Sequence, residues 1–273
     1  MILDGKKVSS EIVENIKNNI LKDNLSIGLA IIWLGDNPSS EIYIKNKREK
    51  CKYVGIKSEL YHFNNEVLES DVIKLINELN ERDDIDGIII QSPVPENIDY
   101  VKCVNMISPS KDIDGFTNIS IGNLVQKRPS IISCTPKGII KLLEYYNIPL
   151  EGKRVCIINR SNIVGKPLFQ LFLDKNATVT ICHSKTKNLD EITRNSDIIV
   201  SAVGKPKFIT SDMVNEDATI IDVGITRVGD KVVGDVDFDN VKDKVKYITP
   251  VPGGVGPMTI AMILENLFEI KRK

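Results

Sequence analysis

The sequence is poor in the residues that build metal sites and disulfide frameworks. Its 273 residues include two histidines and five cysteines, and no two cysteines are spaced C-x-x-C. An odd number of scattered cysteines is typical of a reduced intracellular protein in which cysteine serves as a small core residue. We therefore expect no metal site and a cytoplasmic location.

Long apolar runs and an excess of one charge are also missing. No segment approaches the roughly 20 apolar residues that a spanning helix needs, and residues 1–17 lack a signal-peptide core. Lys and Arg total 36 against 37 Asp and Glu. The chain therefore has no excess of positive charge that would attract nucleic acid or an anionic membrane. The basic cluster at 45–52 lacks interleaved aromatic residues. We expect neither nucleic acid nor a membrane as a partner.

The sequence does contain a repeated alternation of strand and helix patterns. Apolar residues recur at helical spacing in 6–22, 69–81 and 134–147, where Thr135 is a plausible N-cap, and continuous apolar runs predict strands at 27–34 and 86–90. Residues 108–124 read as loop, and from Lys153 strands and helices alternate again with short connections. The pattern predicts an α/β protein whose second half is a doubly wound parallel sheet, with two lobes and a cleft between them.

The segment 155–167 indicates a dinucleotide site in the second lobe. A strand leads directly into a turn that opens a helix, which is where a Rossmann-type fold holds a pyrophosphate. Asn159, Ser161 and Gly165 take a spacing comparable with the usual glycines. The next strand ends without an acidic residue for the ribose hydroxyls, so Arg160 nearby favours NADP over NAD. The alternative is that Arg160 is a solvated loop charge.

The first lobe supplies polar groups for a substrate. Tyr43 and Lys47 lie four residues apart on one helical face, Gln91 ends a strand, and Asp114 lies in a loop. A lysine beside a glutamine can shuttle a proton, and a carboxylate can accept paired N–H groups of a heterocycle. Each residue alone also fits a solvated helix or an acidic turn. Their combination with the glycine-rich 249–259 segment favours a site.

These motifs together resemble a known enzyme family. The chain contains, in order, "SSEIYIKNKREKCKYVGI", "GIIIQSPVP", "PSKDIDGF", "CTPKGI", "NRSNIVGKP", "ATVTICHSKT", "IIDVGI", "GDVDF" and "TPVPGGVGPMT". This set closely resembles bifunctional methylenetetrahydrofolate dehydrogenase/methenyltetrahydrofolate cyclohydrolase over nearly the whole chain. The resemblance implies oxidation of 5,10-methylenetetrahydrofolate with NADP, then hydrolysis to 10-formyltetrahydrofolate, in a homodimer that takes tetrahydrofolate derivatives as substrates.

The resemblance also implies a domain division and roles for individual residues. It implies a folate-binding catalytic domain at 1–120, on which a C-terminal helix at 256–273 packs, and an NADP-binding Rossmann domain at 135–250. Lys47 matches the lysine of the cyclohydrolase step, Gln91 the glutamine that tunes it, and Asp114 the pterin anchor. We assign substrate binding to Tyr43, Ser40, Pro93, Gly256 and Thr259. We assign cofactor binding to Asn159, Arg160, Ser161, Gly165, Ser184 and Ile225.

The chain departs from the family pattern at three positions. Ser92 stands where the family commonly has leucine, Asn159 where the cofactor turn normally has glycine, and Thr117 where histidine often follows "DGF". Ser92 makes a smaller and more polar wall, and Asn159 bears on cofactor affinity. None of the three removes a proposed catalytic group.

Three other functions remain open on the sequence alone. A different NADP-dependent dehydrogenase explains the second lobe but leaves "KDIDGF" and "PVPGGVGPMT" without a role. A non-catalytic folate-binding or regulatory protein, and a member with dehydrogenase activity only, are the other two. The joint presence of Tyr43, Lys47, Gln91 and Asp114 disfavours a binding protein, and that of Lys47 and Gln91 disfavours a dehydrogenase-only member.

Overall fold

The computed structural model describes residues 1–272, with Ser39 described by its backbone alone. The chain divides into two compact units. The three-stranded unit comprises residues 11–132 and the chain from Ile263, and the five-stranded unit comprises 1–10 and 133–262. The long helices α1 (Gly5–Lys22) and α10 (Val255–Lys271) contribute residues to both units. Within the described part of the chain, no helix combines the length and apolar character that crossing a membrane requires.

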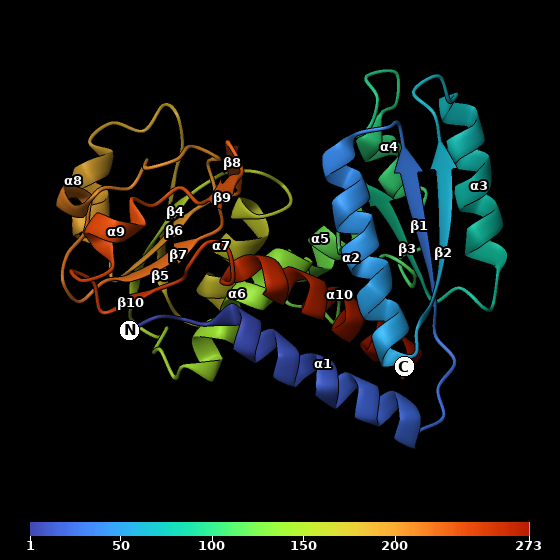
Figure 1. Ribbon diagram of the computed structural model, residues 1–273, viewed down its shortest axis with the longest axis horizontal. Coiled ribbons are helices and arrows are strands. Elements are labelled where there is room, and N and C mark those ends of the chain that lie inside the picture. The colour runs from blue at the N-terminus through green and yellow to red at the C-terminus, as the bar shows by residue number, and fades with distance from the viewer. Residues whose placement is uncertain (273) are drawn as a thin grey trace. The chain divides into compact units, whose positions relative to one another are not determined.

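The three-stranded unit is built on a parallel sheet in the order β2-β1-β3. Every residue of β1 is buried, which fits its continuous apolar sequence. One face is covered by α3 and α4, whose apolar residues join those of β1 and β3 in one core, while α2 lies on the other face (Figure 1). The elements are β1 (Gly28–Leu34), α2 (Pro38–Val54), β2 (Lys57–Phe63), α3 (Glu69–Glu81), β3 (Gly87–Gln91), α4 (Tyr100–Asn105) and α5 (Asn118–Val125).

The five-stranded unit carries a second parallel sheet in the order β10-β7-β6-β4-β5. This order is that of a doubly wound sheet, because β5 and β6 lie on opposite sides of β4. A short antiparallel hairpin of β8 and β9 follows β7. The remaining elements are α6 (Cys134–Tyr145), β4 (Arg154–Ile158), α7 (Gly165–Asp174), β5 (Thr178–Cys182), α8 (Leu189–Arg194), β6 (Ile198–Ser201), a 3-10 turn (Ser211–Met213), β7 (Thr219–Asp222), β8 (Thr226–Val228), β9 (Lys231–Val233), α9 (Phe238–Val241) and β10 (Tyr247–Ile248).

The α/β class and the parallel sheets predicted from the sequence are confirmed, and two local expectations are wrong. The stretch expected to be loop-rich contains α5, whose first turn is capped by Thr117, since its hydroxyl accepts a hydrogen bond from the Ser120 amide at 3.2 Å. The helix expected to be capped by Thr135 begins two residues earlier, at Cys134, with Ser133 in the N-cap position. The Thr135 hydroxyl instead lies 2.9 Å from that of Thr259.

Candidate functional site

The structure brings Lys47 and Gln91 together at one edge of the three-stranded sheet. Gln91 ends β3 and pairs in register with Trp33 near the end of β1, where the strand order reverses. Open parallel sheets bind ligands at such a reversal, outside the carboxyl ends of the strands. The Lys47 ammonium, on α2, donates a hydrogen bond to Gln91 Oε1 at 2.9 Å. Gln91 Nε2 donates to the Ser92 carbonyl at 2.8 Å, so both ends of the amide are fixed.

The predicted substrate residues Ser40, Tyr43 and Pro93 belong to the same two segments. Ser40 is buried, and its hydroxyl donates to the Ser92 carbonyl at 3.5 Å. Tyr43 lies one helical turn before Lys47 and is 40% exposed, and burial raises the pKa of its phenol. Pro93 follows a cis peptide bond from Ser92. A neutral phenol, a cation and an amide thus occur side by side along α2 and the end of β3.

Asp114 lies in a loop that neighbouring residues hold from both sides. Before it, the Lys111 ammonium donates to the carbonyls of the last turn of α3, at 3.0 Å to Leu79, 2.7 Å to Asn80 and 2.7 Å to Arg82. The Asp112 carboxylate accepts hydrogen bonds from the backbone amides of Phe116 and Thr117, at 3.1 and 2.9 Å. The backbone on both sides of Asp114 is therefore fixed by the side chains of Lys111 and Asp112.

Tyr100 is a candidate site residue that the sequence did not reveal. Its ring packs against the core cluster formed by β1, β3, α3 and α4. Burial is the main cause that raises the pKa of the phenol, the Asp114 charge raises it further, and a hydrogen bond with Ser92 lowers it. The phenol therefore lies among Ser92, Asp114 and the core. Its position at the start of α4, directly after the capping residue Asp99, was the available sequence signal.

The turn between β4 and α7 is organised by the Asn159 side chain. Asn159 Oδ1 accepts hydrogen bonds from the amide of Ser161 at 2.8 Å, its hydroxyl at 2.7 Å and the amide of Gly165 at 3.0 Å. Asn159 Nδ2 donates to the Ala202 carbonyl after β6 at 2.6 Å. A Cβ on Gly165 would lie 2.3 Å from the Asn159 carbonyl, so only glycine allows this approach. The asparagine thus ties the turn to both strands at the reversal of the strand order.

The residues around this turn fit a phosphate-bearing dinucleotide. Arg160 and Ser184 are exposed and follow β4 and β5, which pair in register up to Ile158 and Cys182. Lys185 follows Ser184, and no acidic residue lies at this end of β5. Guanidinium, ammonium and hydroxyl groups at adjacent strand ends match the anionic oxygens of such a ligand. No cluster of three His, Cys, Asp or Glu side chains suited to a metal ion occurs within residues 1–272.

Two buried carboxylates, which the sequence analysis did not assign, hold the segment that carries Ile225. Asp222, at the end of β7, accepts hydrogen bonds from the backbone amides of Gly224, Asp235 and Val236 at 2.9–3.0 Å. Asp235 in turn accepts from the hydroxyl of Ser201 at 2.8 Å. Burial raises the pKa of Asp222 to about 6 despite its backbone donors. Ile225 follows directly and is half exposed, so its backbone position depends on this pair.

The last two predicted substrate residues, Gly256 and Thr259, lie in the five-stranded unit on the first turns of α10. An added Cβ on Gly256 would meet no atom within 4 Å. Thr259 pairs with Thr135, as described above. These two residues are therefore fixed by the five-stranded unit, and the other substrate candidates by the three-stranded unit.

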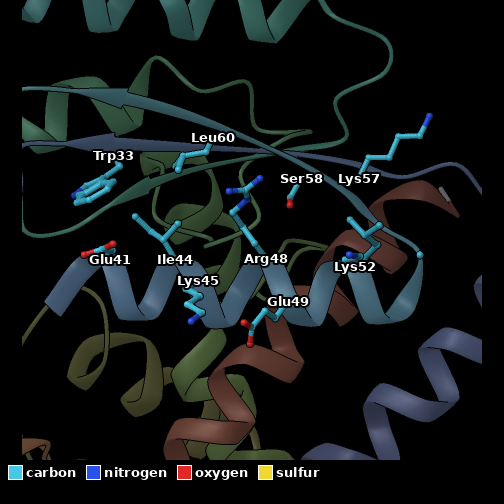
Figure 2. Close-up of a pocket in the computed structure, with 12 residues that line it drawn as sticks. Trp33, Glu41, Ile44, Lys45, Arg48, Glu49, Lys52, Lys57, Ser58 and Leu60 are labelled. Carbon is cyan, nitrogen blue, oxygen red and sulfur yellow. The ribbon is translucent and has the colours of Figure 1, made fainter. Parts of the chain in front are cut away.

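A separate groove of about 840 Å³ runs along the other flank of α2. Figure 2 shows Ile44 and Arg48 rising from α2 toward the strands, with Trp33, Ser58 and Leu60 across the groove. The indole of Trp33 stacks on His62, with ring centroids 3.9 Å apart. Its Nε1 is buried and has no hydrogen-bond partner among the described residues. The groove lies beside β2, the edge strand of the sheet, and does not include Lys47 or Gln91.

Comparison with family models places both halves of the chain in the same family. Residues 3–114 match the model of the tetrahydrofolate dehydrogenase/cyclohydrolase catalytic domain, and residues 133–273 match the NAD(P)-binding domain of that family. The chain belongs to the tetrahydrofolate dehydrogenase/cyclohydrolase family. A similar curated relative is the bifunctional protein FolD of Lachnoclostridium phytofermentans, 49% identical over 97% of this chain and 96% of that protein.

Solved structures of family members have the same fold. The methylenetetrahydrofolate dehydrogenase/cyclohydrolase of Campylobacter jejuni aligns with a TM-score of 0.97 and 45% identity, over 100% of this chain and 98% of that one. The enzyme of Trypanosoma brucei, solved with NADP and an inhibitor, aligns with a TM-score of 0.96 and 32% identity, over 100% and 97%. The family resemblance predicted from the motifs is confirmed.

Proposed function

We propose that the protein oxidises 5,10-methylenetetrahydrofolate with NADP⁺ and hydrolyses the resulting methenyltetrahydrofolate to 10-formyltetrahydrofolate. The observation that carries this proposal is the 2.9 Å hydrogen bond from Lys47 to Gln91 at the reversal point of the three-stranded sheet. A dehydrogenase alone has no need for a lysine held by an amide at this edge. Membership of the family and the relatives' bifunctional names support the same reading.

The oxidation step is mainly a matter of positioning. Removing hydride from the carbon between two nitrogens leaves a cation that both nitrogens stabilise, so the protein needs no strong base. The bound dinucleotide supplies the hydride acceptor. Asp114 anchors the pterin by accepting its N–H groups, and the Tyr43 ring packs against the rest of the folate. We propose Ser40, Pro93, Gly256 and Thr259 as further substrate contacts.

The hydrolysis step needs proton handling, which we assign to Lys47. The neutral amine takes a proton from the water that attacks the methenyl carbon, and the positive charge of the substrate favours that neutral form. Because Gln91 is itself fixed by the Ser92 carbonyl, its Oε1 holds Lys47 in one direction. That proton then passes to the folate nitrogen as its bond to the carbon breaks, and the hydroxyl proton of the adduct is released to water as the formyl carbonyl forms.

The proposed cofactor contacts are the residues of the β4–α7 turn together with Ser184 and Ile225. Asn159, Ser161 and Gly165 shape the turn, Ser184 offers a hydroxyl donor, and Arg160 offers a charged donor to phosphate. The absence of an acidic residue at the end of β5 supports NADP over NAD.

A product analysis tests the proposed function. Purified protein is mixed with 5,10-methylenetetrahydrofolate and either NADP⁺ or NAD⁺, and reduced nicotinamide, methenyl and formyl products are followed over time. We expect reduction with a preference for NADP⁺ and ring opening faster than the uncatalysed rate. Folded protein that binds folate but reduces neither cofactor would instead be a binding protein. Reduction without accelerated ring opening would show a dehydrogenase only.

We further propose that the protein is a cytoplasmic homodimer whose subunits meet at the α2–β2 groove. The edge of β2 offers unpaired backbone groups, which proteins cover or pair. The groove has an apolar floor that includes Ile44 and Leu60, and its rim carries both signs of charge, on Glu41, Lys45 and Arg48 among others. Such a surface is complementary to a second copy of itself. All five cysteines are buried free thiols, which supports a reducing compartment.

A further inference from the structure

The peptide immediately before Asp114 is among the most constrained parts of the three-stranded unit. Ile113 is fully buried, and its side chain packs so closely on β3 that a Cβ added to Gly87 would lie 2.5 Å from it. The preceding carbonyl, of Lys111, accepts a hydrogen bond from the amide of Ile88 at 2.9 Å. The Ile113 side chain and the residues just before it are therefore held against β3, which leaves the direction of the Ile113 carbonyl to be set.

A buried asparagine on α10 holds that carbonyl. Asn266 is fully buried, and its Nδ2 donates to the Ile113 carbonyl at 2.8 Å and to the Ile132 carbonyl at 3.0 Å. Its neighbours Leu264 and Leu267 are buried apolar residues of the same helix. An amide in such surroundings is costly unless it is hydrogen-bonded, and here one nitrogen serves two carbonyls from different segments.

We propose that Asn266 is a positioning residue for folate, which aims the Asp114 carboxylate by fixing the peptide between Ile113 and Asp114. The proposal rests on the proposed role of Asp114 as the pterin anchor. The plane of a peptide sets the orientation of the residue that follows it, so releasing the Ile113 carbonyl lets Asp114 rotate away from the heterocycle. Asn266 itself touches no substrate in this scheme.

The effect of losing Asn266 is expected to remain local. Lys111 still holds the end of α3, and Asp112 still holds the amides of Phe116 and Thr117, because none of these bonds involves Asn266. The loop therefore keeps its course while one peptide gains freedom. The second acceptor, Ile132, directly precedes the crossing of the chain into the five-stranded unit at Ser133. Asn266 thus ties the Asp114 loop to the segment that leads toward the cofactor-binding residues.

The test is a double-mutant cycle between Asn266→Leu and Asp114→Ala, read as KM for methylenetetrahydrofolate in the dehydrogenase assay. Leucine keeps the branched shape of the asparagine side chain, with somewhat larger volume, and removes both N–H donors. We expect Asn266→Leu to raise this KM by about tenfold, because the Asp114 carboxylate then loses its fixed orientation toward the pterin. KM for NADP⁺ and kcat are expected to stay within about twofold. In the Asp114→Ala background, Asn266→Leu is expected to change the folate KM no further.

Two comparisons make the result decisive. Asn97→Leu removes an asparagine donor to the Val67 carbonyl in the same unit and is expected to leave both KM values unchanged. If Asn266→Leu does not fold, Asn266→Ala is measured in the same cycle. Additive effects, or equal increases in both KM values, would show a merely structural role and overturn the inference. An unchanged folate KM in Asp114→Ala would instead overturn the proposed role of Asp114.

Discussion

At the scale of single residues, Lys47 is the group whose function separates the two proposed activities. Its ammonium contacts Gln91, which is 44 residues away in the chain. Both residues were proposed from the sequence because one follows a strand-to-helix turn and the other ends a strand. The family resemblance implied that Gln91 tunes Lys47, whereas residue patterns alone could not predict their contact, since it depends on the order of the strands and on the rotation of α2 about its axis.

Replacing Lys47 with methionine is expected to abolish the cyclohydrolase activity and to leave the dehydrogenase activity. Methionine keeps the apolar stem and removes the amine that takes the proton. The rate of ring opening is therefore expected to fall by about 100-fold or more. The measurement is the rate of methenyltetrahydrofolate hydrolysis beside the rate of nicotinamide reduction. Lys45→Met, an exposed lysine on the groove side of the same helix, is the matched control. Wild-type ring opening in Lys47→Met would remove Lys47 from the mechanism.

At the scale of elements, the β4–α7 turn shows how a departure from the family pattern is accommodated. The sequence indicated a helix-opening turn in which Asn159 stands where the family has glycine. The structure gives a reason for the asparagine. Its side chain makes four hydrogen bonds that hold the turn, and glycine could make none of them. One of these bonds reaches the Ala202 carbonyl after β6, which is 43 residues further along the chain and cannot be read from local patterns.

Changing Asn159 to glycine is expected to destabilise the protein by about 1–3 kcal/mol, because three donors in the turn and the Ala202 carbonyl lose their partner. The check is the shift in the denaturation midpoint. Asn176→Gly is the control, since Asn176 is exposed and its φ is 62°, a conformation that glycine adopts freely. Equal stability of the two variants would show that the Asn159 bonds contribute nothing.

The buried Asp222 gives the segment after β7 a pH dependence. Its pKa is raised by burial to about 6, above the ordinary value near 3.8, so the folded state binds the proton more tightly than the unfolded chain. The contribution of Asp222 to stability is therefore complete below about pH 4 and declines by about 3 kcal/mol as pH rises through 6. Above that it is constant.

Two measurements check this dependence. The carboxyl carbon resonance of Asp222, assigned by its loss in Asp222→Asn, is expected to titrate with a midpoint near 6. The stability difference between wild type and Asp222→Asn is expected to fall between pH 4 and pH 6. A midpoint near 4 would mean that the backbone donors outweigh burial.

Sequence patterns predicted long elements better than short ones. Strand β1 and helix α3 were evident because each carries a sustained apolar pattern. Helix α5 was missed because its eight residues are stabilised by the Thr117 cap and by packing, which no periodicity reveals. The start of α6 was misplaced for a similar reason. Ser133 and Thr135 both resemble caps, yet the hydroxyl of Ser133 donates to the Ile163 carbonyl, and Thr135 pairs with Thr259.

At the scale of the whole molecule, the predicted groove contact between subunits can be tested by charge. Leu60→Arg places a cation on the apolar floor of the groove and is expected to convert a dimer into a monomer. The measurement is light scattering after size exclusion. Leu68→Arg, at an exposed leucine in the same unit, is expected to remain dimeric. A dimeric Leu60→Arg variant would place the interface elsewhere.

Trp33 makes the groove observable without any label. It is the single tryptophan of the chain, and its indole stacks on His62 at one end of the groove. All indole emission therefore originates at this position. A second subunit that covers the groove would change the surroundings of the indole ring and so alter the wavelength and intensity of that emission. Dilution of the native protein, followed by fluorescence alone, then reports subunit dissociation at concentrations far below those that scattering requires.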